Sequence, residues 1–218
     1  GAERIFNMMD EEPANVYAFI HAVSSRLREG QVTVVGNGSA CVVGGHAYII
    51  KKGQRFITNS AIASMGYDLP AAIGAWTASR DKGCYSQGGD RSGEDLILVT
   101  GDGSMQMNLQ ELQTIIHHRM GIKIFVINNG GYHSIRQTQK NFFGEPLIGI
   151  GVDSGDLSFP ALDKLAAAYG YPYVSARHNS ELGEAVEKTL AAEGPAICEV
   201  FVSMDQNFEP KSSAKRLP

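Results

Sequence analysis

Two loop sequences carry residue types that could bind a metal ion. Gly101-Asp102-Gly103-Ser104 follows one apolar segment, and Asn128-Asn129-Gly130-Gly131 follows the next one along the chain. Asp102 offers a carboxylate oxygen and Asn129 an amide oxygen, and a backbone carbonyl would add a third ligand. Mg²⁺ favours sparse oxygen sets of this kind, which water and substrate phosphates complete. Because glycines let the backbone approach an anion closely, the sequence predicts Mg²⁺ bridged to a diphosphate.

The elements around these loops must bring them to one edge of a sheet. The alternation of apolar segments with helical patterns predicts an α/β fold with three layers, in which a mostly parallel sheet has helices on both faces. Loops at the carboxyl ends of neighbouring parallel strands share one rim, so we expect Asp102 and Asn129 to face a common crevice. Strands are predicted at 32–35, 96–99, 122–127, 173–175 and 196–202, helices at 13–29, 69–78, 109–116, 160–169 and 180–192, and an exposed loop at 81–94.

Composition limits the partners and the location of the protein. The 218 residues include 19 basic and 23 acidic side chains, and the resulting net charge of -4 argues against nucleic acid or an anionic membrane as a partner. The uncharged run 31–50 is interrupted by polar residues and glycines, so a membrane span is not expected. Cys41, Cys84 and Cys198 lack metal-ligand spacing, which favours a reducing compartment and predicts a cytoplasmic protein.

The glycine-rich loops also have features of two other kinds of enzyme. Gly36 and Gly38 follow a predicted strand as in nicotinamide-binding folds, but Cys41 stands in place of the third glycine and Phe56 in place of the acidic residue. A phosphohydrolase built on Asp102 would need a second acidic residue beside it, and the two preceding residues are not acidic. Each loop alone could be an ordinary turn. The two together, both at strand ends, favour a functional site.

The two loops and the chain between them resemble a family signature. In GDGSMQMNLQELQTIIHHRMGIKIFVINN, Gly-Asp-Gly at 101–103 is followed by Asn-Asn at 128–129. This pattern is similar to that of thiamine diphosphate-dependent enzymes of the group that includes acetolactate synthase, benzoylformate decarboxylase and pyruvate decarboxylase. SMGYDLPAAIGA at 64–75 resembles a helix-opening motif of the same family. The resemblance covers nearly the whole chain and implies that residues 1–218 form the C-terminal, diphosphate-binding domain.

The resemblance also implies roles for individual residues. Asp102, Asn129 and the backbone carbonyl of Gly131 would be the Mg²⁺ ligands. Met65 would hold thiamine diphosphate in a bent conformation, and the carbonyl of Ala63 would accept a hydrogen bond from its 4'-amino group. The other cofactor-binding positions would be Gly38, Ser39 and Ala40 in one loop and Gly101, Gly103 and Ser104 in the other.

The residues that would contact the substrate are less closely matched to one subgroup. His133 follows the metal loop and is the candidate catalytic acid or base; the alternative is a solvated or locally bonded histidine. Thr138 stands where acetolactate synthases have a tryptophan, and Ile135 stands where pyruvate decarboxylases have a glutamate. The run 128–136 looks most similar to the benzoylformate decarboxylase pattern, so the substrate stays open.

The resemblance implies an enzyme that decarboxylates or ligates 2-keto acids, with thiamine diphosphate as the electron sink. The family's activating glutamate comes from a pyrimidine-binding domain, which this sequence does not contain. We therefore expect the chain to carry the diphosphate and metal half of an active site, with little or no turnover alone, as an excised domain or one subunit of a split enzyme. Homo-oligomers, dimers above all, are expected. A non-catalytic regulatory or assembly module that binds thiamine diphosphate is the alternative.

Overall fold

The computed structural model of the chain describes residues 12–80 and 95–209. Within these residues, six strands form one sheet in the order β2-β1-β3-β4-β6-β5, and all neighbouring strands are parallel. The mostly parallel sheet that the sequence predicts is confirmed. The strands are β1 (Val32–Val35), β2 (Arg55–Thr58), β3 (Leu96–Gly101), β4 (Ile122–Asn128), β5 (Tyr173–Ala176) and β6 (Ala196–Phe201).

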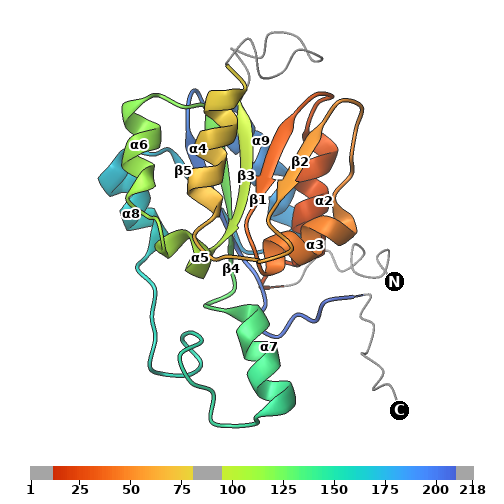
Figure 1. Cartoon of the computed structure of the whole chain (residues 1–218), viewed down its shortest axis with the longest axis vertical. Coiled ribbons are helices and arrows are strands. Elements are labelled where there is room, and N and C mark those ends of the chain that lie inside the picture. The colour runs from red at the N-terminus through yellow and green to blue at the C-terminus, as the bar shows by residue number, and fades with distance from the viewer. Residues whose placement is uncertain (1–11, 81–94, 210–218) are drawn as a thin grey trace.

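Helices cover both faces of the sheet, as Figure 1 shows. One apolar core lies between the sheet and helices α2, α3 and α9, where the rings of Phe19 and Phe125 are 6.0 Å apart. The second core lies between the opposite face and helices α4, α6 and α8, and it buries Leu98 and Ile124 completely. The predicted three-layer architecture is confirmed. The helices are α2 (Val16–Arg26), α3 (Ser39–Ala47), α4 (Asp68–Ala78), α6 (Glu111–His117), α8 (Leu162–Tyr169) and α9 (Leu182–Ala191), with a 3₁₀ turn, η1 (Asn179–Glu181), before α9.

The sequence explains where individual elements begin and end. β3 and β4 are rich in Val, Ile and Leu because parallel strands between two helical layers are buried on both sides. The side chain of Asn15 caps α2 by accepting hydrogen bonds from the backbone N–H groups of Tyr17 and Ala18. Pro13 therefore lies before this helix, and the predicted helix start at residue 13 is wrong. α8 ends at Tyr169, as predicted, because Gly170 follows in the left-handed conformation with a φ of 78°.

Four elements have no counterpart among the predicted ones. α7 (His133–Phe142) is mostly polar and β2 has only two large apolar residues, so neither shows a clear apolar pattern. α3 contains two glycines, and α5 (Asp102–Gln106) is very short. Figure 1 shows α7 projecting beyond the edge of the sheet where β4 ends. The loop predicted at 81–94 lies outside the described residues, and none of the helices within those residues is long and apolar enough to cross a bilayer.

Candidate functional site

A cavity of about 550 Å³ opens at the carboxyl ends of the central strands. The segments that follow β1, β3 and β4 line it, including the first turns of α3, α5 and α7, together with residues from the segment 60–65 that follows β2. Its volume suits a small-molecule ligand or cofactor. All the predicted site residues except Ala40 line this cavity. The side chain of Ala40 instead packs in the core beneath α2, so only its backbone could serve a ligand.

Asp102 is held by both loops that the sequence singles out. It begins α5 directly after β3, and its Oδ1 accepts a hydrogen bond of 2.8 Å from the N–H of Gly103. Its Oδ2 accepts a bond of 3.0 Å from the N–H of Gly131 in the loop after β4. Burial raises the pKa of the Asp102 carboxyl to about 7, while these N–H groups act in the opposite direction. A cation beside this carboxylate would compensate the cost of burying its charge.

Asn129 presents an oxygen without a hydrogen-bond partner. Its Nδ2 donates to the Oγ of Ser39 at 3.3 Å, whereas its Oδ1 is buried and no described residue donates to it. The backbone carbonyl of Gly131 likewise has no donor among residues 12–80 and 95–209. Leaving a buried acceptor unpaired is costly, and a metal ion would satisfy it. Asp102, Asn129 and Gly131 therefore fit an oxygen-ligated cation.

Only one of these three candidate ligands, the carboxylate of Asp102, carries a charge. The described residues contain no group of three or more His, Cys, Asp or Glu side chains that could hold a metal ion. Asp102 is also the only acidic residue among the described residues that line the cavity. An ion bound here would take one carboxylate, one amide and one carbonyl from the protein. Mg²⁺ tolerates so few protein ligands because it retains water and binds phosphate oxygens.

Asp68 is a buried acid that contacts residues on both sides of the Gly-Asp-Gly sequence at 101–103. Sequence reasoning missed it. The hydroxyls of Thr100 and Ser104 both donate to its carboxylate, the second at 2.9 Å. The Oγ of Ser104 also accepts a bond of 3.0 Å from the N–H of Gly66. The hydroxyl proton of Ser104 is therefore already donated to Asp68 and is not available to a phosphate. The role of Ser104 in binding phosphate stays a prediction. Burial raises the pKa of Asp68.

Ala63 and Met65 lie on the β2 side of the cavity. Met65 is 37% exposed, so its side chain is available to a ligand. Ala63 has a φ of 54°, which is strained for a residue with a side chain. Its carbonyl accepts a bond of 2.7 Å from the Nδ2 of Asn37, and its second lone pair could serve a further donor. Sequence reasoning also missed Asn37, although its position between Gly36 and Gly38 in a glycine-rich loop could have indicated a role in the site.

His133 begins α7 and is buried. Its Nε2 lies 2.8 Å from the backbone carbonyl of Gln206, which requires a proton on this nitrogen because a carbonyl only accepts. Its ring meets that of Phe208 edge-on with centroids 5.2 Å apart. Burial lowers the pKa of His133, which favours the neutral ring. The hydrogen bond to Gln206 and the ring contact with Phe208 fit a locally bonded histidine. The catalytic role of His133 stays a prediction.

The loop after β4 is packed against the loop after β3. A Cβ atom at Gly103 would lie 2.4 Å from the Cε1 of Tyr132, so the glycine makes room for this ring. The ring of Tyr132 also packs against Phe159 with centroids 5.7 Å apart. Sequence reasoning missed Tyr132, although an aromatic residue directly after the predicted metal loop was the available signal. Gly103 therefore makes room for the packing of the two loops, and its role in binding a cofactor stays a prediction.

Comparisons with known proteins agree with this geometry. Residues 36–200 match the family model described as thiamine pyrophosphate enzyme, C-terminal TPP binding domain. Acetolactate synthase of Arthrospira platensis is 31% identical over 157 residues, which are 72% of this chain and 24% of that protein. The large subunit of acetolactate synthase from Cyanidium caldarium is 33% identical over 157 residues, with the same shares. Acetolactate synthase 2, chloroplastic, of Nicotiana tabacum is 28% identical over 211 residues, which are 91% of this chain and 30% of that protein.

The matched range contains every predicted site residue. The chain spans about a quarter of the length of the first two relatives and somewhat more of the third. The match covers well over half of the chain, so the resemblance based on the Gly-Asp-Gly and Asn-Asn loops is confirmed. The chain belongs to the thiamine pyrophosphate enzyme family, as a C-terminal domain that binds thiamine diphosphate.

Proposed function

We propose that this domain binds thiamine diphosphate through Mg²⁺ and forms the diphosphate and metal half of an active site that acts on 2-keto acids. One observation carries the metal part of the proposal. The carboxylate of Asp102 and the unpartnered Oδ1 of Asn129 belong to residues that line one cavity, and Gly131 joins their loops. Without a cation, this arrangement leaves a buried acceptor unsatisfied in the same cavity as a buried acid.

The residues of the chain would act by binding and orientation. Asp102, Asn129 and the carbonyl of Gly131 would hold Mg²⁺, which would bind the diphosphate. Met65 would support the bent cofactor, while Asn37 fixes the carbonyl of Ala63 in place. When bound, thiamine diphosphate accepts the electron pair released as a carbon–carbon bond next to a carbonyl breaks. The protein contributes position and charge to this chemistry.

The proposed reaction is a carboligation of 2-keto acids. The relatives named above are acetolactate synthases, and their names support a catalytic role over a non-catalytic module. Ile135 lines the cavity with an apolar side chain, which argues against a catalytic carboxylate there. Thr138 is exposed on the same helix. We propose that a pyrimidine-binding domain supplies the activating glutamate in a homo-oligomer, because the described cavity lining contains no glutamate.

Calorimetric titration tests the metal bridge. The domain is titrated with thiamine diphosphate in the presence of Mg²⁺ and in the presence of a chelator. We expect binding that depends on Mg²⁺ and is lost in Asp102→Ala. Asp163→Ala removes an exposed acid from α8 and is the matched control. Equal binding by the wild-type protein and Asp102→Ala would refute the metal bridge.

A second experiment tests the reaction. The domain is mixed with a pyrimidine-binding domain that carries the glutamate, and the consumption of pyruvate is followed together with the release of CO₂ and the formation of acetolactate. We expect acetolactate only in the mixture that contains thiamine diphosphate and Mg²⁺. Release of CO₂ without a ligated product would indicate a decarboxylase instead. Cofactor binding without any reaction would favour the regulatory or assembly module.

A further inference from the structure

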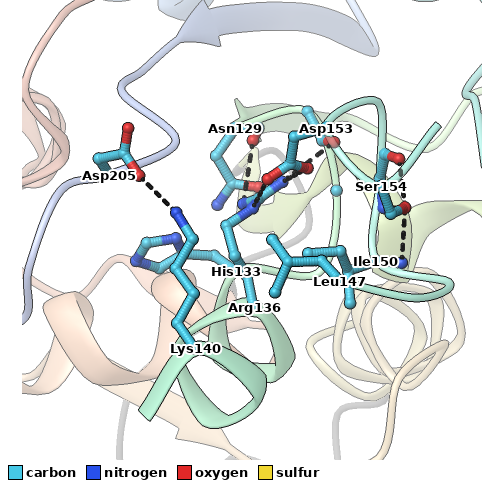
Figure 2. A network of polar contacts seen from close by, with 12 residues as sticks. Asn129, His133, Arg136, Lys140, Leu147, Ile150, Asp153, Ser154 and Asp205 are labelled. Atoms are coloured by element: carbon cyan, nitrogen blue, oxygen red, sulfur yellow. Dashed lines mark hydrogen bonds and ion pairs between the residues drawn. The ribbon is translucent and has the colours of Figure 1, made fainter. Parts of the chain in front are cut away.

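Arg136 is a buried arginine that lies behind the candidate metal loop. It belongs to α7 and is only 1% exposed. Its Nε donates to the Oδ2 of Asp153 at 2.7 Å, and its Nη2 donates to the Oδ1 of the same carboxylate at 2.9 Å. Figure 2 shows this two-pronged contact, which is geometrically specific because the planar guanidinium matches the planar carboxylate.

The same guanidinium contacts the backbone of the metal loop. Its Nη1 lies 3.4 Å from the carbonyl oxygen of Asn129, and its Nη2 lies 3.3 Å from that of Gly130. Arg136 therefore binds two successive carbonyl groups directly before Gly131. Fixing these carbonyls restricts the rotation of the two peptide planes between Asn129 and Gly131, and thereby the backbone that carries the Asn129 side chain and positions Gly131.

Asp153 comes from a second loop, which is packed tightly onto the first. Gly131 and Gly151 form an isolated antiparallel bridge, in which Tyr132 N–H donates to the carbonyl of Ile150 at 2.7 Å and Val152 N–H donates to that of Gly130 at 3.2 Å. The bridge places the backbone of the second loop directly against the metal loop. The ion pair of Arg136 with Asp153 connects the second loop to α7 as well.

Charge also matters at this position. A buried guanidinium next to a metal loop would repel a divalent cation, and a buried charge without a partner is costly. Asp153 neutralises Arg136 through both carboxylate oxygens, and these hydrogen bonds lower the pKa of Asp153. The pair can thus hold the loop without adding net positive charge beside the cation.

We propose that Arg136 and Asp153 are positioning residues, which together fix residues 129–131 in the geometry that binds Mg²⁺. The inference rests on the proposed function, because it presumes that Asn129 and Gly131 are metal ligands. Neither residue of the pair needs to touch the metal or the cofactor. Residues that orient metal ligands in this way change metal affinity by roughly ten- to a hundredfold when they are replaced.

Two variants and a control test the proposal. Arg136→Lys keeps the charge but cannot reach the carboxylate and both carbonyls, and Asp153→Asn leaves the guanidinium without its counter-charge. Lys140→Gln is the control, because Lys140 lies one turn further along α7 and forms an exposed ion pair with Asp205 at 3.0 Å (Figure 2). We expect both test variants to bind thiamine diphosphate roughly ten- to a hundredfold more weakly with Mg²⁺, and the control to bind like the wild-type protein.

Hydrogen exchange of the cofactor-free domain separates positioning from general stability. We expect the amides of Tyr132 and Val152 to exchange faster in both test variants, while the amides of β3 and β4 keep their wild-type rates. Faster exchange throughout β3 and β4, or unchanged Mg²⁺-dependent affinity, would overturn the proposal. Failure of the wild-type domain itself to bind with Mg²⁺ would refute the proposed function, whereas normal binding by the wild-type protein and both test variants would refute only the positioning role.

Discussion

The backbone N–H of Gly131 donates a 3.0 Å hydrogen bond to the Oδ2 of Asp102, which joins the loop after β4 to the loop after β3. The two strands are direct neighbours, and Gly101 at the end of β3 is in register with Ile127 near the end of β4. The loops that follow the two strands therefore begin at the same level of the sheet edge. The two candidate ligand loops are close to each other because the strands before them are paired in register, and neither loop has to be long to reach the other.

The unpartnered oxygen of Asn129 leads to a prediction about ligand-induced stability. Asn129→Ala removes one 3.3 Å hydrogen bond to Ser39 together with a buried acceptor that has no donor. These effects oppose each other, so the free energy of unfolding without ligand should change by about 1 kcal/mol or less. The rise in melting temperature with Mg²⁺ and thiamine diphosphate should shrink strongly, because ligand stabilisation follows affinity.

Thermal unfolding with and without both ligands measures this effect. Asn141→Ala, which alters an exposed asparagine of α7, is the control and should keep the full rise in melting temperature. A wild-type rise in Asn129→Ala would show that the amide oxygen does not take part in ligand binding.

The contact between Gly103 and Tyr132 predicts non-additive mutations. Gly103→Ala would place a methyl group 2.4 Å from the tyrosine ring, so it should cost about 1–3 kcal/mol of stability. Tyr132→Ala removes the obstacle, and in that background Gly103→Ala should cost much less. Denaturant unfolding of the four proteins gives a coupling energy, expected between about 0.5 and 3 kcal/mol.

Gly101→Ala is the matched control for this cycle, because a Cβ at Gly101 meets no atom within 4 Å. Its stability should remain within about 0.5 kcal/mol of the wild-type value. A coupling energy near zero between positions 103 and 132 would contradict the packing described for the two loops.

The close approach of Gly151 to the loop after β4 predicts an effect of mutation that is specific to this position. A Cβ at Gly151 would lie 2.1 Å from the carbonyl oxygen of Gly130, so Gly151→Ala must open the bridge to Gly131. Gly155→Ala is the control, because Gly155 also has a positive φ but would meet no atom within 4 Å. The control should lose about 1 kcal/mol. Gly151→Ala should lose more stability and also bind the cofactor more weakly in calorimetry. Equal effects of the two variants would contradict the importance of the bridge.

The predicted strands were recovered well because buried parallel strands are short, nearly continuous apolar runs. β1 and β4 lie within a residue of their predicted ranges. The positions of Asp102 and Asn129 follow from the same pattern, since residues at the ends of neighbouring parallel strands share one edge. Both residues line one cavity, as expected.

Other parts of the site depend on contacts that a linear pattern does not contain. α7 carries few apolar residues, so it lacks the apolar stripe by which a helix is predicted. The pairing of Arg136 with Asp153 joins this helix to an irregular loop. Asp68 lies within a motif that was recognised for its helix, but burial of its carboxylate depends on the fold around Thr100. Ala40 is predicted to lie in a phosphate-binding loop, but it belongs to the first turn of α3, which directs its side chain into the core.

The burial of Asp68 predicts how stability depends on pH. Burial raises the pKa of Asp68 in the folded protein, so between the unfolded value of about 3.9 and the raised value the folded state holds more protons than the unfolded state. The contribution of Asp68 to stability therefore falls as pH rises through this window. Asp68→Asn should abolish that part of the pH dependence, because its amide can accept from Ser104 and donate to Thr100 without ionising. Urea unfolding at several pH values above about 4 measures the difference, with Asp163→Asn as the surface control. A constant difference between the wild-type protein and Asp68→Asn over this range would show that the buried carboxyl does not titrate there.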